Sequence, residues 1–225
     1  MTDNKTYDTF LLDFDGTISN TYNGVTRCLK EACVKFGGNP DDFDFKKFIG
    51  PPLTWTFNIM FPDDLKKQEE ALAYYRALYI KDGLFDCEMY EGIDTLVKSL
   101  KEAGARVGVA TSKKENFAVM VLEKLGLYQH LDFVSGFAEN RTDKTQVICH
   151  AIETYGIDKD KCLMIGDTFY DLQGAQNAGI DAVGILYGFG SKEDMLKFPH
   201  VAILETVKDL SDFVLQKVDT CPSRN

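Results

Sequence analysis

Basic residues are scarce in this chain relative to acidic ones. The 225 residues include 25 Lys and Arg against 35 Asp and Glu, which gives a formal net charge of -10 at pH 7. A surface of this charge repels a polyanion such as a nucleic acid unless a local basic patch attracts it, and the sequence shows no such patch. We therefore expect no nucleic-acid partner.

Long apolar segments are missing as well. No apolar run approaches the roughly 18 residues that a membrane-spanning helix needs. Residues 1–5 lead into a predicted strand without the apolar stretch of a secretory signal. The sequence thus predicts a cytoplasmic protein without a membrane partner.

The cysteines lack the spacing of a metal or redox site. No two of them form a Cys-x-x-Cys pair, so neither a zinc site nor a dithiol motif has its ligands. We expect reduced thiols that pack as small hydrophobic side chains. The six cysteines are Cys28, Cys33, Cys87, Cys149, Cys162 and Cys221.

Hydrophobic residues make up 44% of the chain, enough to build a buried core, and their spacing defines its organisation. A short apolar strand is predicted at residues 9–12, followed by an amphipathic helix at residues 25–36. Further helical segments are predicted at residues 43–49 and 63–82, separated by proline-containing breaks. Since no strand pattern interrupts residues 18–88, they are predicted to form a helical cap inserted after the first strand.

From residue 90 onward, helical patterns alternate with short strands that are apolar on both faces. The predicted strands lie at residues 107–110, 133–134, 162–165, 182–186 and 201–204. Such alternation is typical of a parallel sheet covered by helices on both sides. The predicted fold is therefore α/β, with a doubly wound, Rossmann-like core of residues 1–17 and 89–225 and an all-helical cap of residues 18–88.

Polar side chains follow several predicted strands, at the edge where open α/β sheets bind their ligands. Clustered carboxylates supply the oxygen ligands that Mg²⁺ prefers, and hydroxyl and ammonium groups can bind a phosphoryl group. The sequence therefore suggests a joint metal and phosphate site. The candidate residues are Asp13, Asp15, Thr111, Ser112, Lys144, Asp167 and Asp171.

These motifs make the chain resemble the haloacid dehalogenase-like hydrolase superfamily, in its phosphoglycolate phosphatase and β-phosphoglucomutase-like branch, over essentially the whole length. Residues 10–17 (Phe-Leu-Leu-Asp-Phe-Asp-Gly-Thr) resemble the family's first motif, and residues 109–113 (Val-Ala-Thr-Ser-Lys) resemble the second. Lys144 fits the third motif. Asp167 and Asp171, within residues 165–179, fit the fourth, metal-holding motif.

The resemblance implies a Mg²⁺-dependent phosphatase that hydrolyses small phosphate monoesters. Asp13 would form an aspartyl-phosphate, and Asp15 would act first as acid and then as base. Mg²⁺ would be held by the Asp13 carboxylate, the Asp15 backbone carbonyl and Asp167, with Asp171 acting in an outer shell or through water. The implied catalytic residues are Asp13, Asp15, Thr17, Thr111 and Lys144; those that bind substrate are Thr111, Ser112 and Lys144; those at the metal are Asp13, Asp15, Asp167 and Asp171.

Other activities stay open beside this one. The family's sugar phosphomutases follow the first motif with an Asp-Ser/Thr pair and a nearby histidine, whereas this chain has Asn20-Thr21 and no histidine in the predicted cap. A phospho-accepting receiver module combines similar residues but has no use for a cap. A dehalogenase does not require Asp15. The histidines, His130, His150 and His200, all lie in the predicted core, where surface or packing roles are expected.

The substrate depends on the cap. A carboxylate-bearing substrate such as phosphoglycolate favours a cap arginine, but residues 48–57 contain none. Cap aromatic residues could instead stack on a base, which keeps a 5'-nucleotidase open, or they could form the cap's own core. The aromatic residues are Trp55, Phe57 and Phe61, and the nearest cap cations are Arg27, Lys46 and Lys47. We expect a monomer or homodimer, with cap hinges near residues 17–20 and 85–90.

Overall fold

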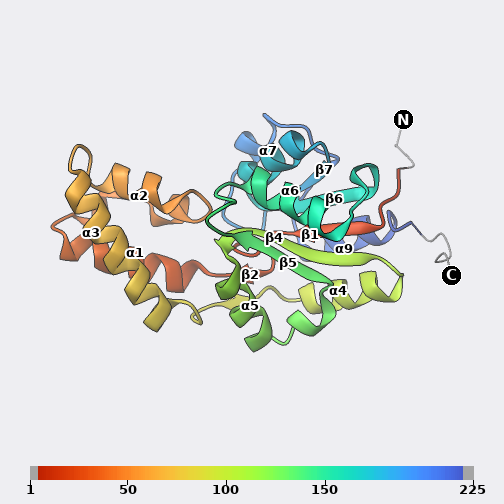
Figure 1. Ribbon diagram of the computed structural model, residues 1–225, viewed down its shortest axis with the longest axis horizontal. Helices are drawn as coiled ribbons and strands as arrows, with labels where there is room; N and C mark the ends of the chain where they lie inside the picture. Colours follow the sequence, from red (N-terminus) through yellow and green to blue (C-terminus); the bar gives the residue numbers. More distant parts are fainter. Residues whose placement is uncertain (1–4, 220–225) are drawn as a thin grey trace. The chain divides into compact units, whose positions relative to one another are not determined.

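The computed structural model describes residues 5–219, which fall into two compact units (Figure 1). The core unit contains residues 5–19 and 89–219, and the cap unit is Asn20–Glu88. The short strands β2 (Ser19–Asn20) and β3 (Glu88–Met89) pair as a two-stranded sheet where the chain leaves the core unit and returns to it.

A six-stranded sheet of order β5-β4-β1-β6-β7-β8 organises the core unit. Every recorded pairing in it is parallel, and the central strand β1 lies between β4 and β6. Because the strand order changes direction at β1, its carboxyl end is the switch point where open α/β sheets bind ligands. The strands are β1 (Thr9–Leu12), β4 (Arg106–Lys114), β5 (Phe133–Phe137), β6 (Cys162–Gly166), β7 (Asp181–Ile185) and β8 (Ala202–Leu204).

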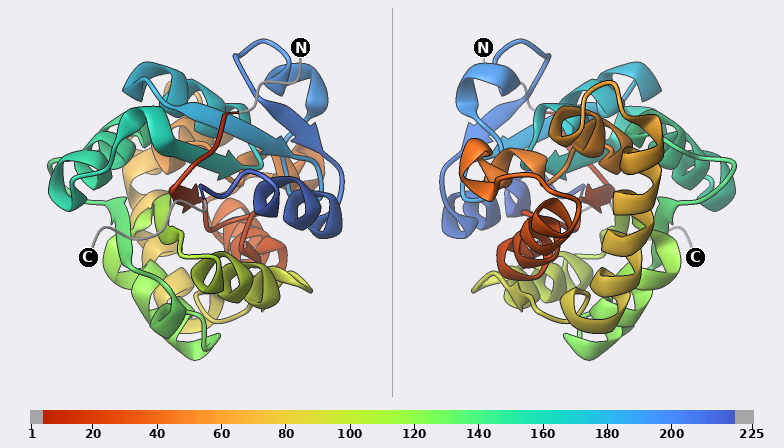
Figure 2. Two further views of the ribbon diagram at one scale, coloured as in Figure 1. Left: turned by 90° about the vertical axis from the view of Figure 1, so that its right-hand side faces the viewer. Right: turned by 90° about the vertical axis from the view of Figure 1, so that its left-hand side faces the viewer.

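Helices cover both faces of this sheet, as Figure 2 shows. On one face, α6 and α7 pack against each other and share a buried cluster with Leu11, Ala110 and Met164. On the other face, α4 packs against α9. The doubly apolar strands of the sequence are thereby explained, and the predicted fold class is confirmed. The core-unit helices are α4 (Ile93–Glu102), α5 (Glu115–Lys124), α6 (Lys144–Tyr155), α7 (Phe169–Ala178), α8 (Lys192–Met195) and α9 (Val207–Leu215).

The cap unit is built around α1 (Tyr22–Lys35), α2 (Leu53–Met60) and α3 (Leu65–Leu78). The predicted helix at residues 43–49 is wrong in kind, since Phe45–Phe48 forms only a 3₁₀ turn, as does Pro40–Asp42. The α-helix predicted at residues 63–82 ends at Leu78, and a π-helical turn, Tyr79–Gly83, follows it directly. Sequence reasoning missed α2, although Pro52 directly before it is a usual residue near a helix start.

No helix within residues 5–219 is both long and apolar enough to span a membrane. The five cysteines in this part of the chain carry free thiols, and Cys221 lies outside the described residues.

Candidate active site

Residues 13–17 of the first motif follow the end of β1. The backbone N–H of Asp13 donates to the carbonyl of Ile165 at 2.9 Å and so continues the pairing with β6. The chain then turns sharply at Gly16, whose φ of +88° favours glycine. A Cβ atom at Gly16 would lie 2.0 Å from Oδ2 of Asp167, so a side chain there would displace that carboxylate.

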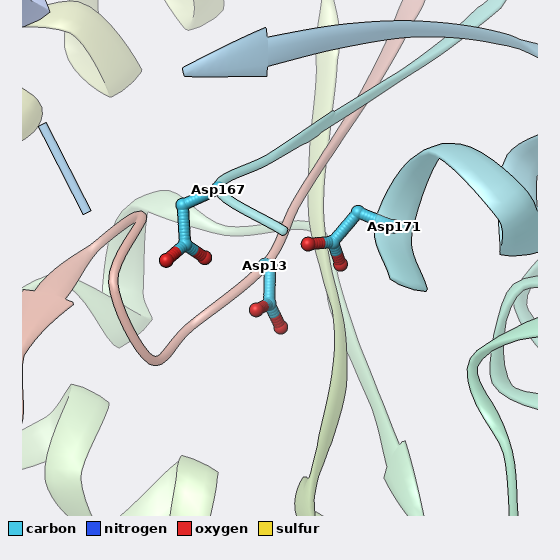
Figure 3. A group of neighbouring side chains, drawn as sticks. All are labelled: Asp13, Asp167 and Asp171. Carbon is cyan, nitrogen blue, oxygen red and sulfur yellow. The ribbon is translucent and has the colours of Figure 1, made fainter. Parts of the chain in front are cut away.

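Three buried aspartates meet at this edge of the sheet (Figure 3). Asp13 follows β1, Asp167 follows β6, and Asp171 lies in the first turn of α7. One carboxylate oxygen from each lies within 4.8 Å of the others. Asp13 is 7% exposed and the other two are fully buried, so their charges are shielded from water. We call this group the aspartate trio.

Lys144 supplies the positive charge within the trio. It is the first residue of α6, with Asp143 as the N-cap, and its side chain is only 6% exposed. Its Nζ donates to Oδ1 of Asp13 at 2.7 Å and to the carbonyl of Ala110 at 3.1 Å, and it lies 2.7 Å from Oδ1 of Asp171. With three carboxylates and one ammonium, the fully ionised cluster carries two unbalanced negative charges.

Burial dominates the electrostatics of the cluster. It raises the pKa of Asp13 to about 6 against the opposing effect of Lys144, and the charge of Asp171 adds to the rise. Burial and then the charges of Asp171 and Asp13 raise the pKa of Asp167 well above its usual value. Burial alone would lower the pKa of Lys144, but the carboxylates of Asp13 and Asp171 outweigh it and raise that pKa.

This cluster fits a divalent cation. Its donors are carboxylate oxygens, which hard cations such as Mg²⁺ prefer, and two charges are left uncompensated by Lys144. Burial is the main cause of the raised pKa values of Asp13 and Asp167, and the neighbouring carboxylates add to the rise, a part that a cation would offset. The Asp171 carboxylate is also held in place by the start of its own helix. Its Oδ2 accepts hydrogen bonds from the N–H and the hydroxyl of Thr168, which form a capping box.

Asp15 stands outside the trio and has a different partner. Both of its carboxylate oxygens accept from Nζ of Lys113, at 2.9 and 3.1 Å. Sequence reasoning included Lys113 in the second motif but gave it no role. The sequence signal that points to Lys113 is its position two residues after Thr111 at the end of β4. Residues two apart on a strand point to the same side of the sheet.

The other predicted site residues divide into two groups. Thr111 is 1% exposed, and Thr17 is fully buried with its hydroxyl donating to Oδ1 of Asp167 at 3.4 Å. Ser112, by contrast, is exposed between the buried Thr111 and Lys113, whose side chain is 6% exposed, so the Ser112 side chain does not belong to the buried cluster.

The loop after β7 also reaches the trio. The N–H of Phe189 donates to Oδ2 of Asp167 at 2.7 Å, and a Cβ atom on Gly188 would lie 2.4 Å from the same carboxylate. The hydroxyl of Tyr187 donates to the carbonyl of Thr17 at 3.1 Å. The sequence motifs do not include this loop, because its contact with Asp167 is made by a backbone N–H, which residue types do not reveal.

Two of the three cap aromatics form the cap's own core, as the sequence favoured over stacking on a base. Phe57 and Phe61 are 1% and 6% exposed, so they pack inside the cap. Trp55 is 43% exposed and meets Phe48 edge-on, with ring centroids 6.0 Å apart. Among the cap cations, Arg27 is held by Asp86, with Nη2 3.1 Å from Oδ2.

Comparison with known proteins shows the family of the chain. Residues 10–185 match the model of the family described as haloacid dehalogenase-like hydrolase, so the chain belongs to that family. It is 33% identical over 192 residues to a 5'-nucleotidase of Pseudomonas aeruginosa, covering 84% of this chain and 87% of that protein. It is 30% identical to the tyrosine-protein kinase PtkA of Mycobacterium tuberculosis, covering 88% of this chain and 70% of that protein.

Solved structures resemble the fold closely. The crystal structure of a predicted phosphatase from Clostridium acetobutylicum superposes with a TM-score of 0.86 at 32% identity, covering 94% of this chain and all of that one. Family membership and phosphatases among the relatives confirm the predicted enzyme class, a phosphoric monoester hydrolase.

Proposed function

We propose that the protein is a Mg²⁺-dependent phosphatase that hydrolyses small phosphate monoesters through an aspartyl-phosphate on Asp13. The observation that carries the proposal is the aspartate trio around Lys144 at the switch point of the sheet. A phosphate ester bound at this edge of the sheet carries negative charge. The hydrogen-bond donors of the site and the Lys144 ammonium can stabilise that charge as it develops in the transition state.

The residues have separate tasks in this proposal. The Asp13 carboxylate, the Asp15 backbone carbonyl and Asp167 would hold Mg²⁺, with Asp171 behind them. When bound, the ion neutralises charge shared between the nucleophile and the phosphoryl oxygens. Thr111 and Lys144 would bind the phosphoryl oxygens, and Thr17 keeps Asp167 oriented through its hydroxyl.

The proposed reaction consists of two nucleophilic displacements at phosphorus. A carboxylate oxygen of Asp13 attacks phosphorus while the bond to the ester oxygen breaks, and that oxygen takes a proton from the Asp15 carboxyl group. A water molecule then gives a proton to the Asp15 carboxylate and attacks the same phosphorus. The bond to Asp13 breaks, which releases inorganic phosphate and restores both carboxyl groups to their starting states.

Within this proposal the alternative substrate class is nucleoside monophosphates, because one relative is named a 5'-nucleotidase and Trp55 is an exposed aromatic side chain of the cap unit. Phosphoglycolate, the substrate that the family resemblance suggested, needs a cation for its carboxylate. The cap arginine considered for that purpose, Arg27, is already paired with Asp86. Lys46 and Lys47 are the exposed alternatives.

The test is phosphate release from a panel of nucleoside monophosphates, phosphoglycolate, sugar phosphates and aryl phosphates, with Mg²⁺ or with excess chelator. Turnover should require both Mg²⁺ and Asp13, so Asp13→Asn should abolish it. Asp8→Asn is the matched control, because Asp8 precedes the opposite end of the same strand. Transfer of phosphate to a second sugar hydroxyl or to a protein tyrosine, or stable phosphorylation of Asp13 without turnover, would refute the proposal.

A further inference from the structure

The ion pair between Lys113 and Asp15 has no role in the site as described so far. The two residues are 98 positions apart, and the pair joins the turn after β1 to the end of β4. Both carboxylate oxygens of Asp15 are engaged by the same ammonium group. The contact therefore fixes both the position and the rotation of the Asp15 carboxyl group.

The surroundings of Lys113 distinguish it from an ordinary surface lysine. Its side chain is 6% exposed, against 19% for Asp15, and its Nζ lies 5.2 Å from the centroid of the Phe14 ring. Removing the lysine and the carboxylate from water costs free energy that offsets much of the attraction between them, so the ion pair is weak evidence for a purely stabilising feature. Lys114, the next residue, is exposed and provides an internal contrast.

We propose that Lys113 is the positioning residue for Asp15 and controls proton delivery to the leaving group; this rests on the phosphatase function proposed above. The Lys113 ammonium holds the Asp15 carboxyl group beside the oxygen that leaves phosphorus. It also balances the negative charge that Asp15 acquires when its proton moves to that oxygen. No bond to Lys113 forms or breaks, so the stoichiometry of the reaction is unchanged.

Proton delivery matters most for poor leaving groups. As the bond from phosphorus to an ester oxygen breaks, an alkoxide or basic phenolate needs the proton from Asp15, whereas 4-nitrophenolate is stable without it. A series of substituted phenyl phosphates varies this demand with little change in size or shape. The slope of log kcat/KM against the acidity of the leaving phenol therefore measures how well Asp15 delivers its proton.

The experiment compares Lys113→Met, Lys113→Arg and the control Lys114→Met, which removes the same charge one residue away. Lys113→Met should lower kcat/KM for phenyl phosphate at least about tenfold more than for 4-nitrophenyl phosphate, because general acid catalysis contributes about 10²–10⁴-fold. Lys113→Arg should restore most of the wild-type slope, and Lys114→Met should keep it. In an Asp15→Asn background, Lys113→Met should cost less than about threefold, since the two changes act on one step.

Equal losses across the phenyl series, or an undiminished loss in the Asp15→Asn background, would overturn the inference while the phosphatase function stands. Failure of the wild type to release phosphate from any ester would overturn both. A readout without turnover is the ¹³C resonance of the Asp15 side-chain carboxyl, identified by its loss in Asp15→Asn. It should move in Lys113→Met and stay in place in Lys114→Met, and an unchanged resonance in Lys113→Met would refute the contact itself.

Discussion

Replacing Lys144 by Met tests whether the aspartate trio depends on its internal cation. Lys144 is buried and lies 2.7 Å from a carboxylate oxygen of Asp13 and from one of Asp171. Methionine keeps most of the side-chain volume but removes the charge. The fully ionised cluster would then carry three buried negative charges with no opposite charge among the described side chains that contact it.

Without added Mg²⁺, we expect Lys144→Met to lower the free energy of unfolding by a large amount. Removing one partner of a buried ion pair costs about 3–5 kcal/mol, because the remaining charge stays desolvated. Total stability of a domain is about 5–15 kcal/mol, so the Lys144→Met protein should fold but unfold at clearly lower denaturant concentration. Mg²⁺ should recover part of this loss, because it binds the folded cluster and not the unfolded chain.

The loss should also depend on pH, with a definite sign. The pKa of Asp13 is raised from 3.8 to about 6 in the folded protein. A carboxyl group whose pKa is raised on folding destabilises the folded state once it ionises; this cost is full above about pH 6, shrinks as pH falls below that, and is gone only below the unfolded pKa of 3.8. Lys144→Met should therefore cost most above pH 7 or so and clearly less near about pH 5, where Asp13 can take a proton.

Urea unfolding in excess chelator, followed by far-UV circular dichroism, measures the effect. Fluorescence is unsuitable, because the single tryptophan, Trp55, lies in the cap unit. Lys98→Met is the control: its ion pair with Asp94 is on the surface, and its loss should cost about 0.5 kcal/mol or less. A loss below about 1 kcal/mol for Lys144→Met, or one that does not change with pH, would refute this electrostatic account.

Three further predictions follow from the same contacts. Mg²⁺ affinity, measured by calorimetry, should rise with pH, because folding raises the pKa of both Asp13, to about 6, and Asp167, and each must lose its proton to bind the ion; a flat profile would contradict this. Phe189→Pro removes the N–H that donates to Asp167 and should weaken Mg²⁺ binding by about tenfold, whereas Phe189→Ala keeps it and should have little effect. Trp55→Ala should raise KM for nucleoside monophosphates by about fivefold or more and leave KM for phenyl phosphate unchanged, if Trp55 stacks on the base.

Much of the core could be predicted from sequence because its signals are local. The apolar run at residues 9–12 reads as a buried strand by itself, and β1 is found there. Asp13 and Asp167 directly follow predicted strands, and the parallel-sheet rule brings such ends to one edge. The cap was less readable, because short helices and 3₁₀ turns leave weak periodicity; α2 was missed for this reason.

Contacts between distant segments had to come from the tertiary structure. Strand alternation places Lys113 rather than Lys114 on the side of Thr111, but that its ammonium meets the Asp15 carboxylate depends on how β1 and β4 pack together. The contact of Phe189 with Asp167 is made by a backbone N–H, which every residue except proline possesses. Burial likewise decided that Phe57 packs inside the cap while Trp55 stays accessible.

The sequence by itself determined the kinds of groups at the site: carboxylates, hydroxyls and a lysine at the ends of parallel strands. Only the tertiary structure decided the pKa values of these groups and therefore their ionisation. The pKa of Asp13 is raised to about 6 because folding buries it beside Asp171, with Lys144 as partial compensation. Desolvation and charge separation depend on distances in space, and residues 13, 144 and 171 come within 2.7 Å contacts only when β1, α6 and α7 pack together.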